Sequence, residues 1–295
     1  MKKSVSLLLA GLMLCGALAG CSSNEPAATT GEETQGETTG ASGAIHVVSR
    51  EDGSGTRGAF VELTGVEDDN GDNTTVEAEI ANRTDAVLTT VAGNEAAIGY
   101  VSLGSLNDTV KAVTVDGVEA TVDNVKSGDY TLSRPFNIAT KGEPTGVAAD
   151  FIGFIMSADG QAIVGEDYIT VNDNAEAFTS DGSSGHITVG GSSSVSPVME
   201  QLIEAYKAVN PNAQIDLQTS DSTSGMTGAM DGTFAIGMAS RELKDEEAAE
   251  LTGTAIALDG IAVIVNTANT VDNLTMDQIR SIYVGETTDW ADVAA

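Results

Sequence analysis

Basic residues are scarce in this sequence, which has 13 lysines and arginines against 44 aspartates and glutamates and a formal net charge of −31. A surface of that sign repels nucleic acid and anionic lipid headgroups, so we expect no nucleic-acid partner and no electrostatic attachment to membranes. The same field opposes an anionic ligand. An anion can therefore be bound only by local groups, namely oriented backbone dipoles and one or two placed arginines.

Cysteine and histidine are rare as well, with two of each. Cys15 lies in a segment that we expect to be removed, which leaves Cys21 as the single cysteine of the mature chain and excludes an intramolecular disulfide. The histidines, His46 and His186, lie on or beside predicted strands without an obvious nucleophile. No group of His, Cys and carboxylate residues has metal-ligand spacing, so we expect no metal and no cofactor.

An apolar run lies at the N-terminus, next to a targeting pattern, and is too short to span a bilayer. Two lysines precede the apolar residues 4–17, and Leu-Ala-Gly-Cys at 18–21 resembles the lipobox at which bacterial lipoprotein precursors are cleaved and acylated. We expect a signal peptide over residues 1–21 and a lipid on Cys21. The mature protein is then extracytoplasmic and attached to the bacterial cell membrane through that lipid alone.

Residues 22–43 are mostly Ser, Thr, Gly and Glu, a composition that favours a disordered tether. Predicted strands and helices alternate over 44–171 and again over 187–295, and the polar stretch 172–186 predicts a linker between them. This alternation is typical of an α/β fold. The expected elements include one helix over 147–164 and a pair of apolar strands over 255–265.

Three turns rich in Gly, Ser and Thr follow predicted strands, at Ser49–Arg57, Gly190–Ser194 and Ser220–Gly225. Each leads into a predicted helix, whose first amide groups and positive dipole end favour an anion, while the glycines allow close backbone approach. The first turn also carries Arg50, a bidentate donor for a tetrahedral oxyanion, with Asp52 close enough to orient it. An ordinary surface ion pair is the alternative for these two residues.

Four motifs make the sequence similar to a known family. They are Ser-Arg-Glu-Asp-Gly-Ser-Gly-Thr-Arg at 49–57, Gly-Ser-Ser-Ser-Val-Ser-Pro at 191–197, Ile-Gly-Met-Ala-Ser-Arg-Glu-Leu at 236–243 and Leu-Asp-Gly-Ile-Ala-Val-Ile-Val-Asn at 258–266. They resemble the phosphate-binding protein of the phosphate ABC transporter over nearly all of 44–295. The resemblance implies a two-lobed periplasmic-binding-protein fold of type II, which captures inorganic phosphate between its lobes and delivers it to the membrane permease.

The resemblance also implies the phosphate-binding residues, carried over position by position. They are Arg50, Ser54, Gly55, Thr56, Ser193, Ser194, Ser222 and Ser240, with Asp52 holding Arg50. The best-known members have an aspartate at the position of Ser240, where it accepts the proton of phosphate. Asp221 adjoins Ser222 and is the expected substitute. We therefore predict that phosphate is preferred over sulfate and that Asp221→Asn narrows this preference.

The order of the motifs departs from the family. Ordinary members begin with the Gly-Ser-Ser-Ser motif, whereas here the Arg50 motif comes first, so we interpret the chain as a circular permutant. Residues near 44 and near 295 should then lie side by side in one lobe. We expect residues 44–171 to form part of the family's second lobe and the return to its first lobe. Residues 172–186 then join the former ends of the chain. Residues 187–295 form the rest of the first lobe and the strand that crosses back to the second.

Three alternatives remain open at this point. The site could hold another tetrahedral oxyanion such as sulfate or molybdate, or the chain could be a degenerate duplicate that binds nothing. Retention of Arg50, Asp52, Ser54 and Thr56 argues against the second of these. A phosphoryl-handling enzyme is the least favoured, because Gly53–Arg57 lacks the lysine of a P-loop.

Overall fold

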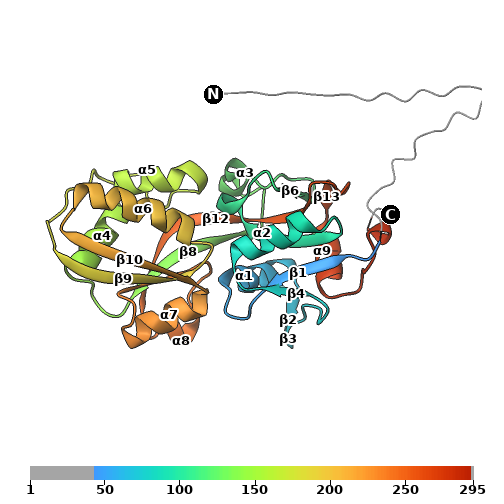
Figure 1. Cartoon of the computed structure of the whole chain (residues 1–295), viewed down its shortest axis with the longest axis horizontal. Coiled ribbons are helices and arrows are strands. Elements are labelled where there is room, and N and C mark those ends of the chain that lie inside the picture. The colour runs from blue at the N-terminus through green and yellow to red at the C-terminus, as the bar shows by residue number, and fades with distance from the viewer. Residues whose placement is uncertain (1–42, 294–295) are drawn as a thin grey trace, which may run out of the picture. The chain divides into compact units, whose positions relative to one another are not determined.

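The computed structural model describes residues 43–293, which belong to one compact unit. The expected signal peptide, the expected lipidation site Cys21 and nearly all of the expected tether lie outside the described residues. Two lobes are joined by a pair of long strands (Figure 1). We call residues 43–132 together with 261–293 the terminal lobe, and residues 133–260 the central lobe.

The terminal lobe contains both described ends of the chain. Its elements before the crossing are β1 (His46–Arg50), α1 (Gly55–Thr64), β2 (Glu67–Asp68), β3 (Gly71–Asp72), β4 (Glu79–Ala81), α2 (Thr84–Gly93), β5 (Ala97–Ser102), η1 (Leu103–Ser105), β6 (Val110–Ala112), β7 (Thr114–Val115) and α3 (Val122–Ser127). After the return it adds the second half of β12 (Thr252–Asn266), β13 (Asn273–Leu274), α9 (Met276–Tyr283) and η2 (Trp290–Asp292).

The central lobe is one uninterrupted stretch of chain. It contains β8 (Ser133–Thr140), α4 (Val147–Ile155), α5 (Ala158–Asp167), β9 (Gly185–Ser192), α6 (Ser196–Val209), β10 (Ala213–Ser220), α7 (Ser222–Asp231), β11 (Ile236–Ala239), α8 (Asp245–Ala248) and the first half of β12. The expected helix over 147–164 is thus two helices, and the expected strand pair over 255–265 is one long strand.

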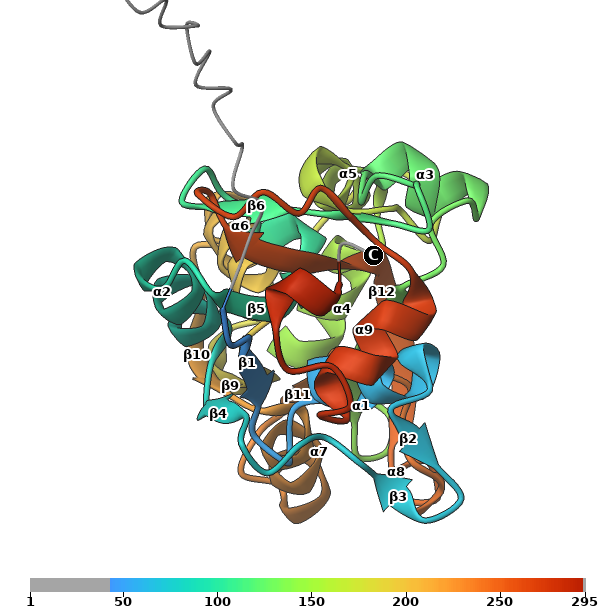
Figure 2. The ribbon, with the colours of Figure 1, turned by 90° about the vertical axis from the view of Figure 1, so that its right-hand side faces the viewer.

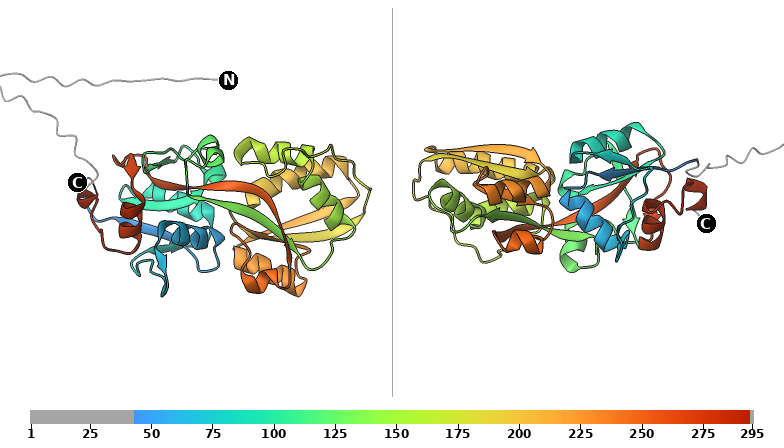
Figure 3. Two further views of the ribbon diagram at one scale, coloured as in Figure 1. Left: turned by 180° about the vertical axis from the view of Figure 1, so that it is seen from behind. Right: turned by 90° about the horizontal axis from the view of Figure 1, so that it is seen from below.

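One sheet runs through both lobes in the order β10-β9-β11-β8-β12-β5-β1-β4, with β6 also paired to β12. Strands β8 and β12 are antiparallel from Ser133↔Gly260 to Thr140↔Thr252, and the second half of β12 pairs with β5. These two strands carry the chain from one lobe to the other, as the view from behind shows (Figure 3). Each lobe can therefore turn about a two-stranded ribbon while its own strands stay paired.

The two described ends of the chain meet in the terminal lobe. Ala44 bridges Asp289, the Ile45 amide donates to the Thr288 carbonyl at 2.8 Å, and the Trp290 amide donates to the Gly43 carbonyl at 3.0 Å. The buried Trp290 also donates its indole N–H to the carbonyl of Ala96 at 2.9 Å. Figure 2 faces this end of the molecule. The prediction that the two ends lie side by side in one lobe is confirmed for the described residues.

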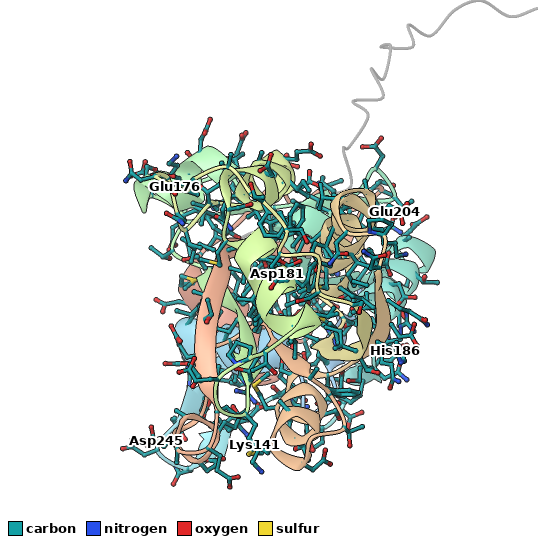
Figure 4. All side chains as sticks on the ribbon, turned by 90° about the vertical axis from the view of Figure 1, so that its left-hand side faces the viewer. Lys141, Glu176, Asp181, His186, Glu204 and Asp245 are labelled. Carbon is teal, nitrogen blue, oxygen red and sulfur yellow. The ribbon has the colours of Figure 1, made fainter. Side chains whose placement is uncertain are left out.

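Each lobe has its own core. In the terminal lobe Phe60 stacks on Tyr100, with ring centroids 3.9 Å apart, and meets Tyr283 edge-on at 4.7 Å. In the central lobe α4, α5 and α6 pack around aromatic residues such as Phe151 and Tyr206, whose centroids lie 5.0 Å apart. The six residues labelled in Figure 4 are exposed instead.

Residues 172–184 contain no helix or strand, and β9 begins at Gly185. The buried carboxylate of Asp150 holds this segment against α4, because it accepts from the Ser180 hydroxyl at 2.6 Å and the Asp181 amide at 2.9 Å. In the described part of the chain no single helix is long and apolar enough to cross a membrane. The bent pair α4 and α5 meets that measure only when both helices are taken together.

Candidate anion-binding site

Four helices begin at the interface between the lobes, two from each lobe. In the terminal lobe α1 begins at Gly55 and α2 at Thr84; in the central lobe α6 begins at Ser196 and α7 at Ser222. Each follows a strand of the main sheet after a short turn. The first amide groups of a helix have no partner within it, and the dipole is positive at this end. The four ends therefore favour negative charge between the lobes.

Hydroxyl groups from both lobes meet there. Thr56 Oγ1 lies 2.8 Å from Ser194 Oγ, and Thr84 Oγ1 lies 3.2 Å from the hydroxyls of both Ser193 and Ser194. All of these side chains are buried. Because the contacts join the terminal lobe to the central lobe, the site exists only when the two lobes are together.

Arg50 supplies the one guanidinium among these hydroxyls in the described residues, and its side chain is only 2% exposed. It lies at the end of β1, where Nη2 donates to Ser193 Oγ at 3.1 Å and Nη1 to Thr84 Oγ1 at 3.4 Å. The carboxylate of Glu51 accepts from both Nε and Nη2 at 2.8 Å. Arg50 thus bridges the lobes in a fixed orientation.

The central lobe adds a chain of serines. Ser192 Oγ accepts from the Ser194 amide at 3.3 Å and donates to Ser240 Oγ at 2.9 Å, and the Ser240 amide donates to Ser222 Oγ at 3.1 Å. Together with the groups above they form what we call the cleft cluster. It comprises Arg50, Thr56, Thr84, Ser192, Ser193, Ser194, Ser222 and Ser240.

Gly55 allows α1 to reach this cluster. A Cβ atom at this position would lie 2.4 Å from Ser222 Oγ and 2.9 Å from Ser240 Oγ, closer than carbon and oxygen can approach. The neighbouring Gly53 carbonyl accepts from the Thr223 amide of the central lobe at 3.1 Å. A larger residue at position 55 therefore requires these hydroxyls or the lobes to move apart.

Most of the predicted site residues are brought together by the structure. Six of them belong to the cleft cluster, and Gly55 touches it. Ser54 is the N-cap of α1, where its hydroxyl accepts from the Arg57 amide at 3.3 Å. Sequence reasoning missed Glu51, Thr84 and Ser192. Thr84 had a usable signal, because it too starts a helix directly after a strand.

Two predicted roles are corrected. Asp52 does not hold Arg50: its carboxylate is fully exposed and pairs with Arg57 at 2.9 Å. Asp221 is the N-cap of α7, where its carboxylate accepts from the amide and hydroxyl of Ser224. Neither carboxylate hydrogen-bonds to the cleft cluster. The turn at 52–53 directs Asp52 away from Arg50, and capping of α7 occupies Asp221.

Cavities flank the cluster on two sides. One, of about 330 Å³, is lined by residues of both lobes, including Arg83, Ser105, Ser193 and Glu200. Another of about 330 Å³ lies between Asp52, Arg57 and Asp72 of the terminal lobe and Thr223, Arg241 and Lys244 of the central lobe. Both are parts of the cleft between the lobes. Within residues 43–293, no group of three or more His, Cys, Asp and Glu side chains could hold a metal ion.

Arg241 closes one edge of the site. Its guanidinium forms a double hydrogen bond with the buried Glu247 at 2.7 and 2.8 Å, and Nη2 also donates to Thr223 Oγ1 at 3.3 Å. Burial by itself raises the pKa of Glu247, but the hydrogen bonds from Arg241 and the Lys244 amide outweigh it and hold that pKa below its usual value of 4.5. The pair is therefore ionised at neutral pH.

The model of the PBP superfamily domain matches residues 15–159 and 176–295 of this chain. This chain belongs to the PBP superfamily. Among PBP-superfamily proteins, the phosphate-binding protein PstS 2 of Streptococcus agalactiae is 47% identical, and the match covers 99% of this chain and 98% of that protein. The identity and coverage place the chain in the PstS group of this superfamily.

Two further members of the superfamily bear on the architecture. The crystal structure of the phosphate-binding protein of a phosphate ABC transporter from Streptococcus pneumoniae is 46% identical. It covers 85% of this chain and 100% of its own, with a TM-score of 0.69, in agreement with the two-lobed α/β fold. The phosphate-binding protein PstS of Bacillus subtilis is 35% identical, but that match covers only 44% of this chain and 42% of that protein.

Proposed function

We propose that this protein captures inorganic phosphate between its lobes and presents it to the permease of an ABC importer. One observation carries this proposal: a buried arginine and buried hydroxyls from both lobes lie where four helices begin. Such a site suits a tetrahedral oxyanion, because hydroxyl and N–H donors converge on it from opposite sides. The names of the relatives described above support phosphate as that anion.

Binding and closure are one process in this proposal. With the lobes apart, the contacts between Thr56 and Ser194 and between Arg50 and Ser193 are broken, and these groups are free to donate to an entering anion. Closure then removes water, which strengthens each hydrogen bond in the site. Since the protein as a whole is strongly acidic, the attraction acts only within the cleft. The permease would recognise the closed pair of lobes.

The remaining parts of the proposal concern place and partners. We propose that Cys21 carries the lipid that attaches the protein to the membrane, so that the captured anion is held near the permease. We also propose that the protein performs no chemistry on its ligand, and that it requires no cofactor.

Calorimetric titration tests the proposal. Protein freed of bound anion is titrated with phosphate, sulfate and molybdate, and small-angle X-ray scattering follows the distance between the lobes. We expect phosphate to bind tightest and to make the molecule more compact. Tighter binding of sulfate or molybdate would assign the site to another oxyanion, and no binding of any of the three would indicate a degenerate duplicate.

The lipid anchor has a separate test. In a bacterial host that acylates lipoproteins, the wild-type protein is expected in the membrane fraction with a mass increase on its N-terminal cysteine. Cys21→Ala should abolish this modification. An unmodified wild-type protein in the soluble fraction would contradict the assignment of Cys21.

A further inference from the structure

The hydroxyls of the cleft cluster already accept hydrogen bonds from N–H groups of the protein. Ser193 Oγ accepts from Arg50 Nη2 and, at 3.4 Å, from the Thr84 amide; Ser222 Oγ accepts from the Ser240 amide. Ser192 Oγ accepts from the Ser194 amide. A serine hydroxyl has one proton and two lone pairs, so Ser193 and Ser222 have lone pairs in use and a proton to offer, whereas Ser192 already donates its proton to Ser240 Oγ at 2.9 Å. These remaining protons favour donation to an anion.

A site that only donates does not distinguish phosphate from sulfate. Near pH 7 phosphate carries a proton, and sulfate does not. Only a hydrogen-bond acceptor favours the protonated oxygen, and a carboxylate does so best because it also repels the bare oxygens of sulfate. Selectivity for phosphate is therefore best achieved by a carboxylate at the edge of the cluster.

Glu51 is the one carboxylate among residues 43–293 that hydrogen-bonds to a member of the cleft cluster. It shares Nη2 of Arg50 with Ser193: Glu51 Oε1 lies 2.8 Å and Ser193 Oγ 3.1 Å from this nitrogen. Its side chain is 21% exposed, whereas that of Asp52 is fully exposed. Its amide donates to the Ala81 carbonyl at 3.2 Å, which fixes the backbone beside β4.

We propose that Glu51 determines the selectivity of this site, by orienting Arg50 and by accepting the proton of phosphate. The proposal rests on the proposed function and goes beyond it in assigning the acceptor. Each carboxylate oxygen of Glu51 receives one N–H from Arg50 and keeps a second lone pair. A phosphate oxygen bound to the same guanidinium thus comes within reach of this carboxylate. Asp221, the acceptor expected from the sequence, lies outside the cluster.

The test is a competition titration of phosphate against sulfate with the full-length protein at pH 7.5. Glu51→Gln keeps the size of the side chain and one acceptor oxygen for Arg50, but removes the negative charge. We expect the affinity for phosphate relative to sulfate to fall by about tenfold or more, with sulfate binding unchanged or stronger. Glu51→Asp retains a carboxylate and should keep the affinity for phosphate higher than the affinity for sulfate.

Asp52→Asn and Asp221→Asn are the matched controls, since each removes one carboxylate beside the site. Both should leave the phosphate-to-sulfate ratio at its wild-type value. Two results would overturn the assignment: an unchanged phosphate-to-sulfate ratio in Glu51→Gln, including an equal loss of affinity for both anions, or a narrowed ratio in Asp221→Asn. Failure of the wild-type protein to bind phosphate would instead refute the proposed function, before any variant is compared.

Discussion

Arg50 is buried, bridges the lobes and forms hydrogen bonds with Glu51, Thr84 and Ser193. In Arg50→Ala the anion loses a charge-assisted donor, and Glu51 loses its partner. We expect a loss of about 2–4 kcal/mol in phosphate binding, roughly 30-fold to 1000-fold in affinity, as measured by calorimetry. Arg280→Ala removes a half-exposed arginine far along the chain, in α9, and should leave binding unchanged. Unchanged binding in Arg50→Ala would show that the site lies elsewhere.

The sequence predicted which residues belong to the cleft cluster better than it predicted their hydrogen-bond partners. A strand followed by a Gly/Ser turn and a helix is a local pattern, so the turns that carry Ser193, Ser222 and Gly55 could be predicted from it, whereas the individual residues were implied by the resemblance. The partner of Arg50 was predicted wrongly. Asp52 was expected because it is close to Arg50 in the sequence and because the resemblance implies this role. The chain turns at 52–53, and this leaves Glu51 beside the guanidinium.

At the scale of elements, the close approach of α1 to α7 gives a test of closure. In Gly55→Ala the added Cβ would meet Ser222 Oγ at 2.4 Å, so the lobes should be held apart. We expect phosphate affinity to fall by about 1–3 kcal/mol, the usual cost of overpacking, and scattering to show a more open molecule with phosphate present. Stability without phosphate should not fall, because alanine favours a helix.

Gly58→Ala is the control for that variant, on the same helix. A Cβ there would have only an ordinary contact, 3.8 Å from Arg241 Cδ. It should therefore leave affinity and closure unchanged. Equal effects of the two substitutions would attribute the loss to α1 itself rather than to its approach to α7.

The pair of Arg241 and Glu247 makes the stability of the central lobe depend on pH. Because the pKa of Glu247 is held below its usual value in the folded protein, its contribution is complete above pH 4.5 and is lost as the pH falls through the folded value. We expect Glu247→Gln to lower the free energy of unfolding by about 1–3 kcal/mol at pH 7. Urea titrations of both proteins should converge as the pH falls below the folded pKa of Glu247, and exposed Glu250→Gln should match wild type throughout.

Element boundaries were the weaker part of the sequence prediction. Apolar spacing continues across 147–164, but Ser157 caps a new helix by accepting from the Gly160 amide at 3.2 Å, and this ends α4. In 255–265 every residue except Asp259 is apolar or glycine, a composition that equally suits two short strands. Only the pairing with β8 on one side and β5 beyond Gly260 shows that β12 is a single strand. Such pairing is a tertiary interaction, so it cannot be predicted from the local sequence pattern.

At the scale of the whole molecule, we propose that the motif order reflects a circular permutation, with 172–186 joining the former ends. Three observations support it. The described ends pair with each other through Ala44 and Asp289, and 172–184 is irregular. The streptococcal relative matches from end to end, whereas the Bacillus subtilis protein matches over less than half of either chain. When two chains carry the same segments in a different order, an alignment between them follows one segment and then ends.

A rearranged chain tests this proposal. Residues 187–295 would come first, followed by a short Gly-Ser linker and then residues 44–171, without the segment between 171 and 187. We expect this chain to fold and to bind phosphate with near wild-type affinity, measured by circular dichroism and calorimetry. A control opened between Ala257 and Leu258 breaks β12 and should not fold stably. If the rearranged chain failed to fold, as the control is expected to, this result would contradict the proposal.

The course of β12 also sets the order in which the protein can be completed during synthesis. The central lobe is whole once residue 260 has left the ribosome, and nothing outside it is needed for its strands to pair. The terminal lobe begins first and finishes last, because β5 and β6 are joined only through residues 261–266. Strands β1, β4 and β5 can pair with one another, but β5 and β6 must wait for their shared partner in β12, which is translated after the central lobe is complete. The terminal lobe is therefore the part most exposed to misfolding and to chaperones in the nascent chain.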